Sequence, residues 1–224
     1  MNHTSHPSGT PTVPAAPAAP TAPGVRQAQK QQTRRALLDA ALGLLEQQNL
    51  SGLGVREVTR AAGMSPAGFY RHFPDLSALG VVLVEESLAN LHDMFRAVFA
   101  ESGGAEQLID RAVEVIAAHV REHRAHVRFL ARERHGGVRE VRGAIAAELR
   151  SFAEEVAAAP AVRQVTEGWP AEDVRMLAEL YVDRMVSTAA AFVEASPEEG
   201  ERIARTVRLQ LRLISTGSRH WNGS

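Results

Sequence analysis

Hydrophobic positions repeat with helical spacing along most of the chain. Leu38, Leu42 and Leu45 share one helical face, and each long segment after Pro74 carries a similar apolar stripe. No run of alternating apolar and polar residues is bounded by a hairpin turn, so the pattern predicts no β-strands. Helices with one apolar face must bury it against one another. The pattern therefore predicts an all-α protein whose C-terminal part is a helical bundle.

Glycine and proline residues divide this helical pattern into segments. They stand at Gly52, Gly54, Gly63, Pro74, Gly103, Gly104, Gly136, Gly137, Pro160, Gly168, Pro170 and Pro197. These divisions predict about nine helices, three near the start and six longer ones behind them. The first residues differ in composition, because a proline recurs at about every third position. We therefore predict a disordered Pro/Ala-rich tail over residues 1–25.

The segment from Gly54 to Phe73 has the pattern of a helix-turn-helix. Val55 to Ala62 predicts a short helix, and Gly63 suits the turn after it because glycine accepts a positive φ. Ser65 is a natural N-cap, and Pro66 suits the first position of the next helix. In such motifs the second helix enters the major groove of DNA with its N-terminal turn leading. The pattern therefore predicts DNA binding.

Small, aromatic and basic residues of this segment are the predicted DNA contacts. Ala67 and Gly68 allow the backbone to approach base edges, and Ala67 can touch a thymine methyl group. The Tyr70 hydroxyl can donate to a phosphate, and Thr33, at the predicted start of the first long helix, can place its hydroxyl and the helix N-terminus on another. The full set is Thr33, Arg56, Ser65, Pro66, Ala67, Gly68, Tyr70, Arg71 and His72.

The charge distribution agrees with a local DNA-binding surface. The whole chain has a formal net charge of -1, so it is not a general polycation. Between Arg26 and Phe73, seven basic residues stand against three acidic ones, which gives this segment a charge of +4. A basic surface at one end of the molecule is the footprint that phosphate binding requires.

These residues resemble the DNA-binding domain of the TetR family of transcriptional regulators. The matching elements are Thr33-Arg34, Ala40-Ala41, Val55 to Ala62, Ala62-Gly63-Met64-Ser65 and Phe69-Tyr70-Arg71-His72-Phe73, in order and in spacing. The resemblance implies a three-helix DNA-binding domain over residues 26–80 and a helical ligand-binding and dimerisation domain over residues 81–219. It also implies a homodimeric repressor that binds a palindromic operator in double-stranded DNA.

Further segments are similar to one subgroup of that family. Phe69 to Phe73, followed by Asp75 and Leu79-Gly80, resembles the repressors of unsaturated fatty-acid biosynthesis and desaturation (FabR/DesT-like). Arg128 to Gly136 and Leu209 to Gly217 resemble their C-terminal segments. This resemblance implies control of fatty-acid synthesis or desaturation genes, with DNA affinity modulated by a long-chain acyl thioester such as acyl-CoA. The alternative is a TetR-type repressor that senses another apolar effector, such as a drug or an aromatic metabolite.

Aromatic residues and arginines of the C-terminal segments are the candidate ligand contacts. They are Phe95, Phe99, Phe129, Arg132, Arg134, Phe152, Tyr181 and Met185. Apolar residues at helical spacing can equally be core, and a pocket between helices is lined by core-type side chains. Arg132 and Arg134 can bind an anionic group such as a CoA phosphate. They can also form ion pairs that fix the helix linking the two domains.

Two copies are expected to pair through their last two helices. The apolar stripes from Val174 to Phe192 and from Ile203 to Ile214 predict this four-helix interface. The pair would present two recognition helices to successive major-groove turns, roughly 34–36 Å apart. A ligand bound between the helices of residues 104–168 would tilt the helix that follows Pro74 and so change the spacing of the two DNA-binding domains.

Other classes of function lack the residues they need. The chain has no cysteine, which excludes disulfides and thiolate metal sites, and no serine has a G-x-S-x-G context. His119, His123 and His126 can chelate a metal at helical spacing, but the arginines around them favour a solvated basic helix end. We therefore predict no enzymatic activity, no metal and no cofactor. Without a membrane-length apolar run or a secretory signal, we expect a cytoplasmic location.

Overall fold

The structure is a computed structural model that describes residues 23–89, 91–100 and 104–221. Over these residues it contains eleven α-helices and one 3-10 helix, without a β-strand, which confirms the all-α fold class. The helices are α1 (Pro23–Leu44), η1 (Leu50–Gly52), α2 (Val55–Ala61), α3 (Pro66–Phe69), α4 (Leu76–Leu88), α5 (Leu91–Ala100), α6 (Ala105–Glu122), α7 (Arg124–Glu133), α8 (Arg139–Ala158), α9 (Pro160–Val165), α10 (Ala171–Glu194) and α11 (Pro197–Ser218). In the described ranges, none is both long and apolar enough to cross a lipid bilayer.

Two predicted segments are each divided into two helices. The segment after Pro74 forms α4 and α5, and the segment after Gly104 forms α6 and α7. The second break falls at His123, whose φ of -123 and ψ of 36 leave the helical region. The break at His123 coincides with neither a glycine nor a proline, so the sequence pattern contained no signal for it. The predicted tail lies largely outside the described residues, and α1 already begins at Pro23.

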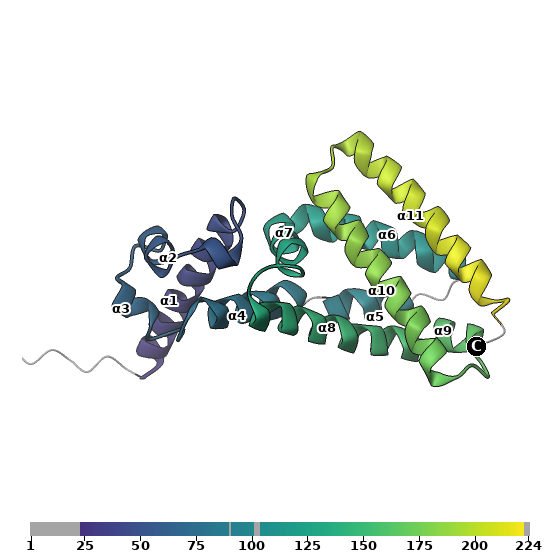
Figure 1. The fold of residues 1–224 in the computed structure, drawn as a ribbon, viewed down its shortest axis with the longest axis horizontal. Helices are drawn as coiled ribbons and strands as arrows, with labels where there is room; N and C mark the ends of the chain where they lie inside the picture. Colours follow the sequence, from purple (N-terminus) through teal and green to yellow (C-terminus); the bar gives the residue numbers. More distant parts are fainter. Residues whose placement is uncertain (1–22, 90, 101–103, 222–224) are drawn as a thin grey trace, which may run out of the picture.

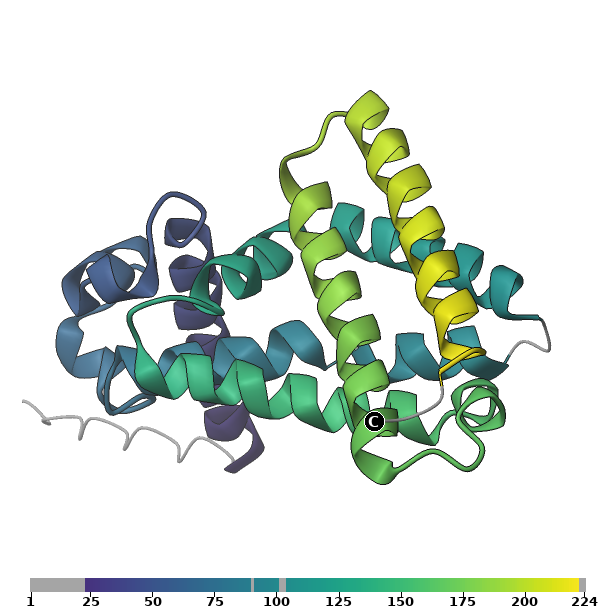
Figure 2. The ribbon, with the colours of Figure 1, turned by 45° about the vertical axis from the view of Figure 1, so that its right-hand side comes forward.

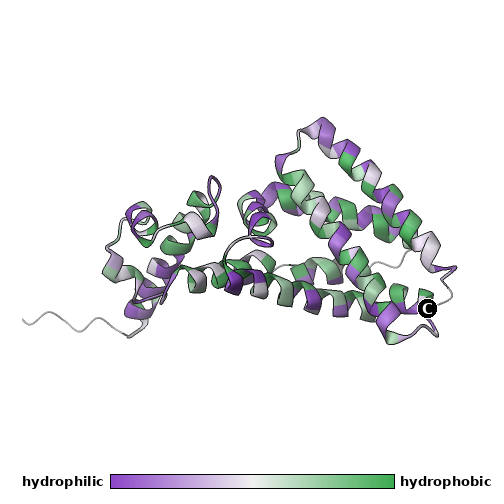
Figure 3. Ribbon diagram, viewed as in Figure 1, coloured by the Kyte–Doolittle hydropathy of each residue, from purple (hydrophilic) through white to green (hydrophobic). Residues whose placement is uncertain are grey.

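Helices α1, α2 and α3 form a small head at one end of the molecule, on the left in Figure 1. Phe69 and Phe73 are buried in its centre, together with Leu38 and Leu42 of α1 and Val58 of α2. The hydropathy colouring in Figure 3 shows apolar residues on the inner faces of these helices. The same apolar cluster continues into α4, α7 and α8, so the head and the bundle share one core at their junction.

Helices α4 and α8 lie side by side and connect the head to the bundle (Figures 1 and 2). Gly80 allows their close approach. A Cβ atom at this position would lie 2.5 Å from Leu50 Cδ2 and 2.7 Å from Val141 Cγ2. Real Cβ atoms do not come so close to other carbons, so only glycine fits between η1 and α8 at this point of α4.

The bundle consists of α5 to α11, with α10 crossing α8, α7 and α6, and α11 packed on α6 and α10 (Figures 1 and 2). The predicted stripes on the last two helices are buried or half-buried within the chain. Tyr181, Met185 and Phe192 of α10 pack with Val207 and Leu211 of α11. The dimer interface predicted from these stripes stays a prediction, because an apolar stripe shows which face is buried but not what buries it.

A different set of apolar residues is exposed on the last two helices. Leu209 and Leu213 of α11 are 63% and 73% exposed, and Met176 and Leu180 of α10 are 47% and 48% exposed. The two helices are antiparallel neighbours, and near their ends Trp221 Nε1 donates a hydrogen bond of 3.0 Å to Asp173 Oδ2. These four residues form what we call the outer apolar face.

Candidate DNA-binding interface and its connection to the bundle

The turn between α2 and α3 has the predicted geometry. Gly63 has a φ of 67, the left-handed conformation that glycine adopts without strain. Ser65 is the N-cap of α3, where its Oγ accepts a hydrogen bond of 3.3 Å from the Gly68 N–H, and Pro66 occupies the first turn. Glycine, N-cap and proline therefore take the positions that a helix-turn-helix requires.

Two phenylalanines fix the face that α3 presents to solvent. Phe69 is 0% exposed and Phe73 is 2% exposed, and their rings contact each other in the core of the head. The opposite face carries Tyr70, which is 59% exposed. Ser65, Pro66, Ala67, Arg71 and, on α2, Arg56 are also exposed. Six of the predicted DNA contacts are therefore accessible from solvent.

Gly68 serves a purpose within the head itself. It is half-buried, and a Cβ atom at this position would lie 3.0 Å from Met64 Cε. The missing side chain makes room for Met64 between α2 and α3, which keeps the two helices of the motif close together. The sequence pattern alone did not distinguish this packing role from a role in contacting DNA.

Basic side chains gather around the end of the motif at His72. Burial and the positive charges of Lys30, Arg71 and Arg34 lower the pKa of His72. The guanidinium of Arg34 lies over the Phe73 ring, 5.1 Å from its centroid, a cation–π contact that holds this charge on the head. At neutral pH the His72 ring is therefore uncharged, while the surrounding cations supply the positive field.

Thr33 does not lie at a helix N-terminus. Because α1 begins at Pro23, Thr33 is inside the helix, and its Oγ1 donates a hydrogen bond of 2.8 Å to the Gln29 carbonyl. The expectation that Thr33 would offer a helix N-terminus to a phosphate was wrong. The residues before Thr33 are mostly Gln, Arg, Lys and Ala, which favour continuing a helix rather than starting one.

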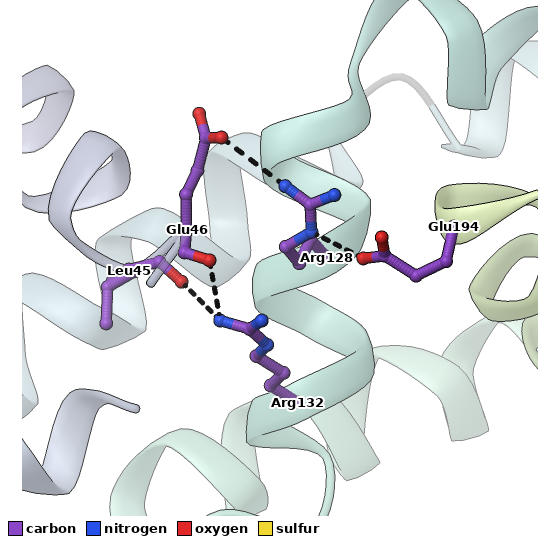
Figure 4. A network of polar contacts seen from close by, with 5 residues as sticks. All are labelled: Leu45, Glu46, Arg128, Arg132 and Glu194. Carbon is purple, nitrogen blue, oxygen red and sulfur yellow. Dashed lines mark hydrogen bonds and ion pairs between the residues drawn. The ribbon is translucent and has the colours of Figure 1, made fainter. Parts of the chain in front are cut away.

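Arginines of α7 join the end of α1 to the end of α10 (Figure 4). Arg132 Nη1 donates hydrogen bonds to the carbonyl oxygens of Leu45 and Glu46, over 3.1 and 2.9 Å. Arg128 contacts the Glu46 carboxylate at 3.3 Å and the Glu194 carboxylate at 2.8 Å. The hydrogen bond from Arg128 lowers the pKa of Glu194. Arg132 thus binds carbonyls that follow the C-terminus of α1, where positive charge is favoured, and Arg128 pairs with two carboxylates.

A buried carboxylate completes this junction. Glu133 is 1% exposed, and its Oε1 accepts a hydrogen bond of 2.8 Å from the Leu50 N–H at the start of η1. Gly136 lies so close to the same carboxylate that a Cβ atom there would be 2.2 Å from Glu133 Oε2. Glu133 lies in the segment from Arg128 to Gly136, and no pattern in the sequence indicates its contact with the start of η1.

The candidate ligand residues fall into two groups. Phe95 and Phe99 have ring centroids 4.3 Å apart, and Phe95 meets Phe152 edge to face at 5.1 Å. Tyr181 packs on the cluster that contains these rings and also on the cluster that contains Met185. Five of the candidates therefore line one continuous apolar region through the bundle, and burial there raises the pKa of Tyr181.

The other candidates lie at the junction with the head. Phe129 is buried in the core shared with α1 and α4. Arg132 binds the α1 carbonyls, and Arg134 is paired with Asp183 of α10. The two arginines thus make the ion pairs and hydrogen bonds that the sequence analysis gave as the alternative to anion binding.

The three histidines near the α6–α7 break form a packed row. The ring centroids of His119 and His123 are 4.6 Å apart, and those of His123 and His126 are 6.2 Å apart. Burial lowers the pKa values of His119 and His126, with a smaller effect from the neighbouring His123. The row is half-buried, while Arg121 and Arg124 beside it are exposed, as expected for a solvated basic helix end.

Comparisons with known proteins agree with this geometry. Residues 37–79 match the family model of bacterial regulatory proteins, tetR family. The matched range runs from α1 into α4 and includes the whole helix-turn-helix. It supports a DNA-binding regulator rather than an enzyme.

The fold of most of the chain is similar to that of several solved regulators. The fatty acid degradation regulator FadR from Bacillus halodurans is 15% identical, with a TM-score of 0.64, over 83% of this chain and 95% of that one. FadR from Bacillus subtilis in complex with stearoyl-CoA is 15% identical, with a TM-score of 0.64, over 82% and 98%. A TetR-family regulator from Streptomyces coelicolor is 18% identical, with a TM-score of 0.64, over 84% and 97%. At these identities the likeness shows a shared fold.

Proposed function

On the premise that residues 37–79 are the DNA-binding domain of a TetR-family transcriptional regulator, we propose that this chain is a dimeric repressor of fatty-acid synthesis or desaturation genes. Its affinity for a palindromic operator changes when a long-chain acyl thioester binds inside the bundle. Residues 26–80 act as the reader of DNA, and residues 81–219 act as the sensor and the dimerisation domain.

The observation that carries the DNA-binding role is the fixed orientation of α3. Buried Phe69 and Phe73 anchor the helix, so Ala67 and Tyr70 face solvent beside the cations around His72. A short helix held in this way can enter a major groove without losing contacts in its own domain. Arg71 and Arg56 add charges that can bind phosphates on either side of the groove.

The outer apolar face supports pairing through α10 and α11. A single exposed leucine is ordinary on a protein surface. Leu209 and Leu213 lie one helical turn apart, and Met176 and Leu180 repeat that spacing on the neighbouring helix. Apolar residues gathered on two adjacent helices are typical of a helix–helix interface between subunits. We therefore propose that two copies pair through this face, on the same two helices as expected from the sequence but through different residues.

The continuous apolar region through the bundle supports an apolar ligand. It contains Phe95, Phe99, Phe152, Tyr181 and Met185, which are held by several small clusters rather than by one dense core. A pocket between bundle helices is lined by side chains of this kind. The solved FadR from Bacillus subtilis, whose fold is similar, is in complex with stearoyl-CoA. This likeness favours an acyl thioester over a drug or an aromatic metabolite as the effector.

The junction between the domains supplies a route from ligand to DNA. Arg128 joins Glu194, at the end of α10, to Glu46, just after α1, and Glu133 binds the backbone of η1. A ligand that moves α10 or α8 therefore moves the head through α7 and α4. The ligand must bind the two arrangements with different affinity for this movement to change operator binding.

The DNA-binding role is tested with exposed residues of α3. Tyr70→Phe removes one hydroxyl, and we expect a roughly five- to tenfold loss of operator affinity, the size of one hydrogen bond. Arg71→Gln should reduce the salt dependence of binding by about one phosphate contact. Arg150→Gln, on the exposed surface of α8, is the matched control. Unchanged affinity and salt dependence in both α3 variants would show that α3 does not read DNA.

The ligand class is tested on the operator complex. Saturated and unsaturated long-chain acyl-CoA are added while DNA binding is followed by fluorescence anisotropy. We expect at least one of them to change the operator affinity, whereas coenzyme A alone should not. If no acyl-CoA has an effect, while a ligand identified by mass spectrometry in the purified protein does, the effector belongs to the alternative class.

A further inference from the structure

An open cleft of about 860 Å³ lies between α6 and the first half of α11, with the end of α10 beside it. Four arginines line this cleft: Arg121 and Arg124 near the α6–α7 break, and Arg205 and Arg208 on α11. The α10–α11 connection lies at the top of the bundle in Figures 1 and 2, away from α3 at the left. The four arginines belong to the bundle and are not among the predicted DNA contacts.

The arginines differ in how far their charges are neutralised. Arg208 is held by Asp110, with 3.1 Å between Nε and Oδ1. Arg124 is close enough to Glu194 to influence its titration, but that carboxylate is hydrogen-bonded to Arg128. Within the described ranges, no carboxylate lies at ion-pair distance from Arg121 or Arg205. Glu201 is the one acidic residue in the lining of the cleft.

The charge of the cleft is therefore positive even after these pairings. Arg121 and Arg205 approach it from different helices, far apart in the sequence, and both guanidinium groups are available to a ligand. A concave surface lined by charges of one sign concentrates their field and attracts an oppositely charged group. Guanidinium groups bind phosphate oxygens in pairs, with a geometry that a lysine ammonium cannot match.

Part of the cleft lining is apolar and belongs to the packing of the bundle. Phe192 and Ala204 line the cleft, and both pack on the same cluster as Met185 and Tyr181. The apolar region assigned to the ligand therefore adjoins the arginine-lined cleft. A molecule that occupied both would have an anionic end in the cleft and an apolar part directed past Phe192.

We propose that the cleft between α6 and α11 binds the phosphorylated end of an amphiphilic ligand, through Arg121 and Arg205. The inference rests on the proposed function and extends it, because it gives the sensor a separate site for the head group. The apolar region selects the acyl chain, and the cleft selects molecules whose other end carries phosphate. A free fatty acid would then bind less tightly than the CoA thioester of the same chain.

The experiment compares two thioesters with the full chain, using the fluorescence of Trp169 and Trp221 or calorimetry. Stearoyl-CoA carries phosphates, and stearoyl-N-acetylcysteamine has the same chain and thioester without them. The test variant is Arg121→Gln with Arg205→Gln. The control is Arg150→Gln with Arg175→Gln, which removes two exposed arginines on α8 and α10 outside the cleft lining.

Wild-type protein and the control should bind stearoyl-CoA more tightly than the neutral thioester. The test variant should lose roughly tenfold or more in affinity for stearoyl-CoA, as expected for charge-assisted hydrogen bonds, and keep its affinity for the neutral thioester. Unchanged binding of stearoyl-CoA by the test variant would overturn the proposal. An equal loss for both thioesters would also overturn it, because the arginines would then act on the fold and not on phosphate.

Inorganic pyrophosphate separates this inference from the proposed function. If the wild-type protein binds neither thioester, the proposal that the ligand is an acyl thioester is wrong. Binding of pyrophosphate by the wild type and the control, but not by the test variant, would then keep the cleft as a phosphate site for another ligand. If pyrophosphate does not bind either, both the acyl ligand and the phosphate site are rejected. The melting temperature of each variant shows whether it is folded.

Discussion

The head and the bundle bury their apolar side chains in different ways. The head, formed by α1 to α3, shares with the adjoining α4 one cluster in which Leu37, Val58, Phe69 and Leu79 are each 0% exposed. The rest of the bundle distributes its buried residues over three smaller clusters, two of which are joined by Tyr181. Residues such as Phe95, Tyr181 and Met185 are only half-buried against those clusters. The side chains of the head are thus densely packed around buried aromatic residues, whereas those of the bundle are packed less densely.

This difference matches what each region has to do. A reader of DNA must hold a few side chains in one geometry, which a dense core achieves because its members have no alternative packing. A sensor must accept a ligand between its helices, so part of its apolar surface has to be incompletely buried before binding. Stability is correspondingly expected to be uneven along the chain, lower in the bundle than in the head.

The largest effect is expected from Phe69→Ala in the centre of the head. Removing a fully buried phenylalanine costs about 3–5 kcal/mol, enough to unfold the head and abolish operator binding. Phe152→Ala is the matched change in the bundle, where Phe152 is 9% exposed at the edge of a smaller cluster, and should cost less. Urea unfolding of both variants measures the difference. Equal losses would contradict the contrast between the two cores.

Ligand binding should stabilise the bundle and leave the head unchanged. At a free concentration one hundred times its Kd, a ligand that binds only the native state adds about 2.7 kcal/mol to the free energy of unfolding. Hydrogen exchange with and without stearoyl-CoA should show slower exchange in α5, α8 and α10. Slowing confined to α1, α2 and α3 would place the ligand in the wrong domain.

A smaller effect is expected from the buried carboxylate at the junction. Glu133→Ala leaves the Leu50 N–H without its acceptor, which costs about 1–3 kcal/mol, and should loosen the head relative to the bundle. Glu133→Gln keeps an oxygen acceptor and serves as the control. Thermal unfolding and operator affinity are measured together. If both variants unfold at the wild-type temperature, this hydrogen bond does not connect the two regions.

The smallest effect concerns pH and the histidine row of the bundle. Burial holds the pKa values of His119 and His126 below their ordinary 6.5, so the folded state keeps them neutral while the unfolded state takes up protons. The contribution of these two histidines to the free energy of unfolding should be complete above pH 6.5 and should decrease as the pH falls below 6.5. His119→Asn with His126→Asn should remove this part of the pH dependence. Urea unfolding at pH 7.5 and 5.5 checks it, and an unchanged dependence would contradict the assignment.

The sequence predicted the helix-turn-helix well because its signals are local. Gly63 has the positive φ that its position demanded, and Ser65 caps the helix that Pro66 begins. Such signals depend on backbone geometry within a few residues. The start of the first long helix was wrongly predicted at Thr33, because no residue in the run before it marks the start of a helix. His123 breaks a helix without being glycine or proline, so only packing of the whole chain reveals that break.

Contacts between distant segments could not be predicted in the same way. The stripe from Val174 to Phe192 was recognised as apolar, but α6 and α11 cover it within one chain. The arginine-lined cleft brings Arg121 together with Arg205, and the junction brings Glu133 to Leu50. Each of these pairs depends on how the helices cross, which hydrophobic periodicity does not specify.

Gly80 has a further consequence for how this molecule can change shape. A side chain larger than hydrogen at this position would come too close to Leu50 on one side and to Val141 on the other, so α4 is held tightly there between the two domains. A helix that is held on both sides at one residue can pivot about that residue but cannot slide along its own axis. Gly80 then acts as a pivot point of α4. Gly80→Ala would add one methyl group there and would change the angle between the head and the bundle.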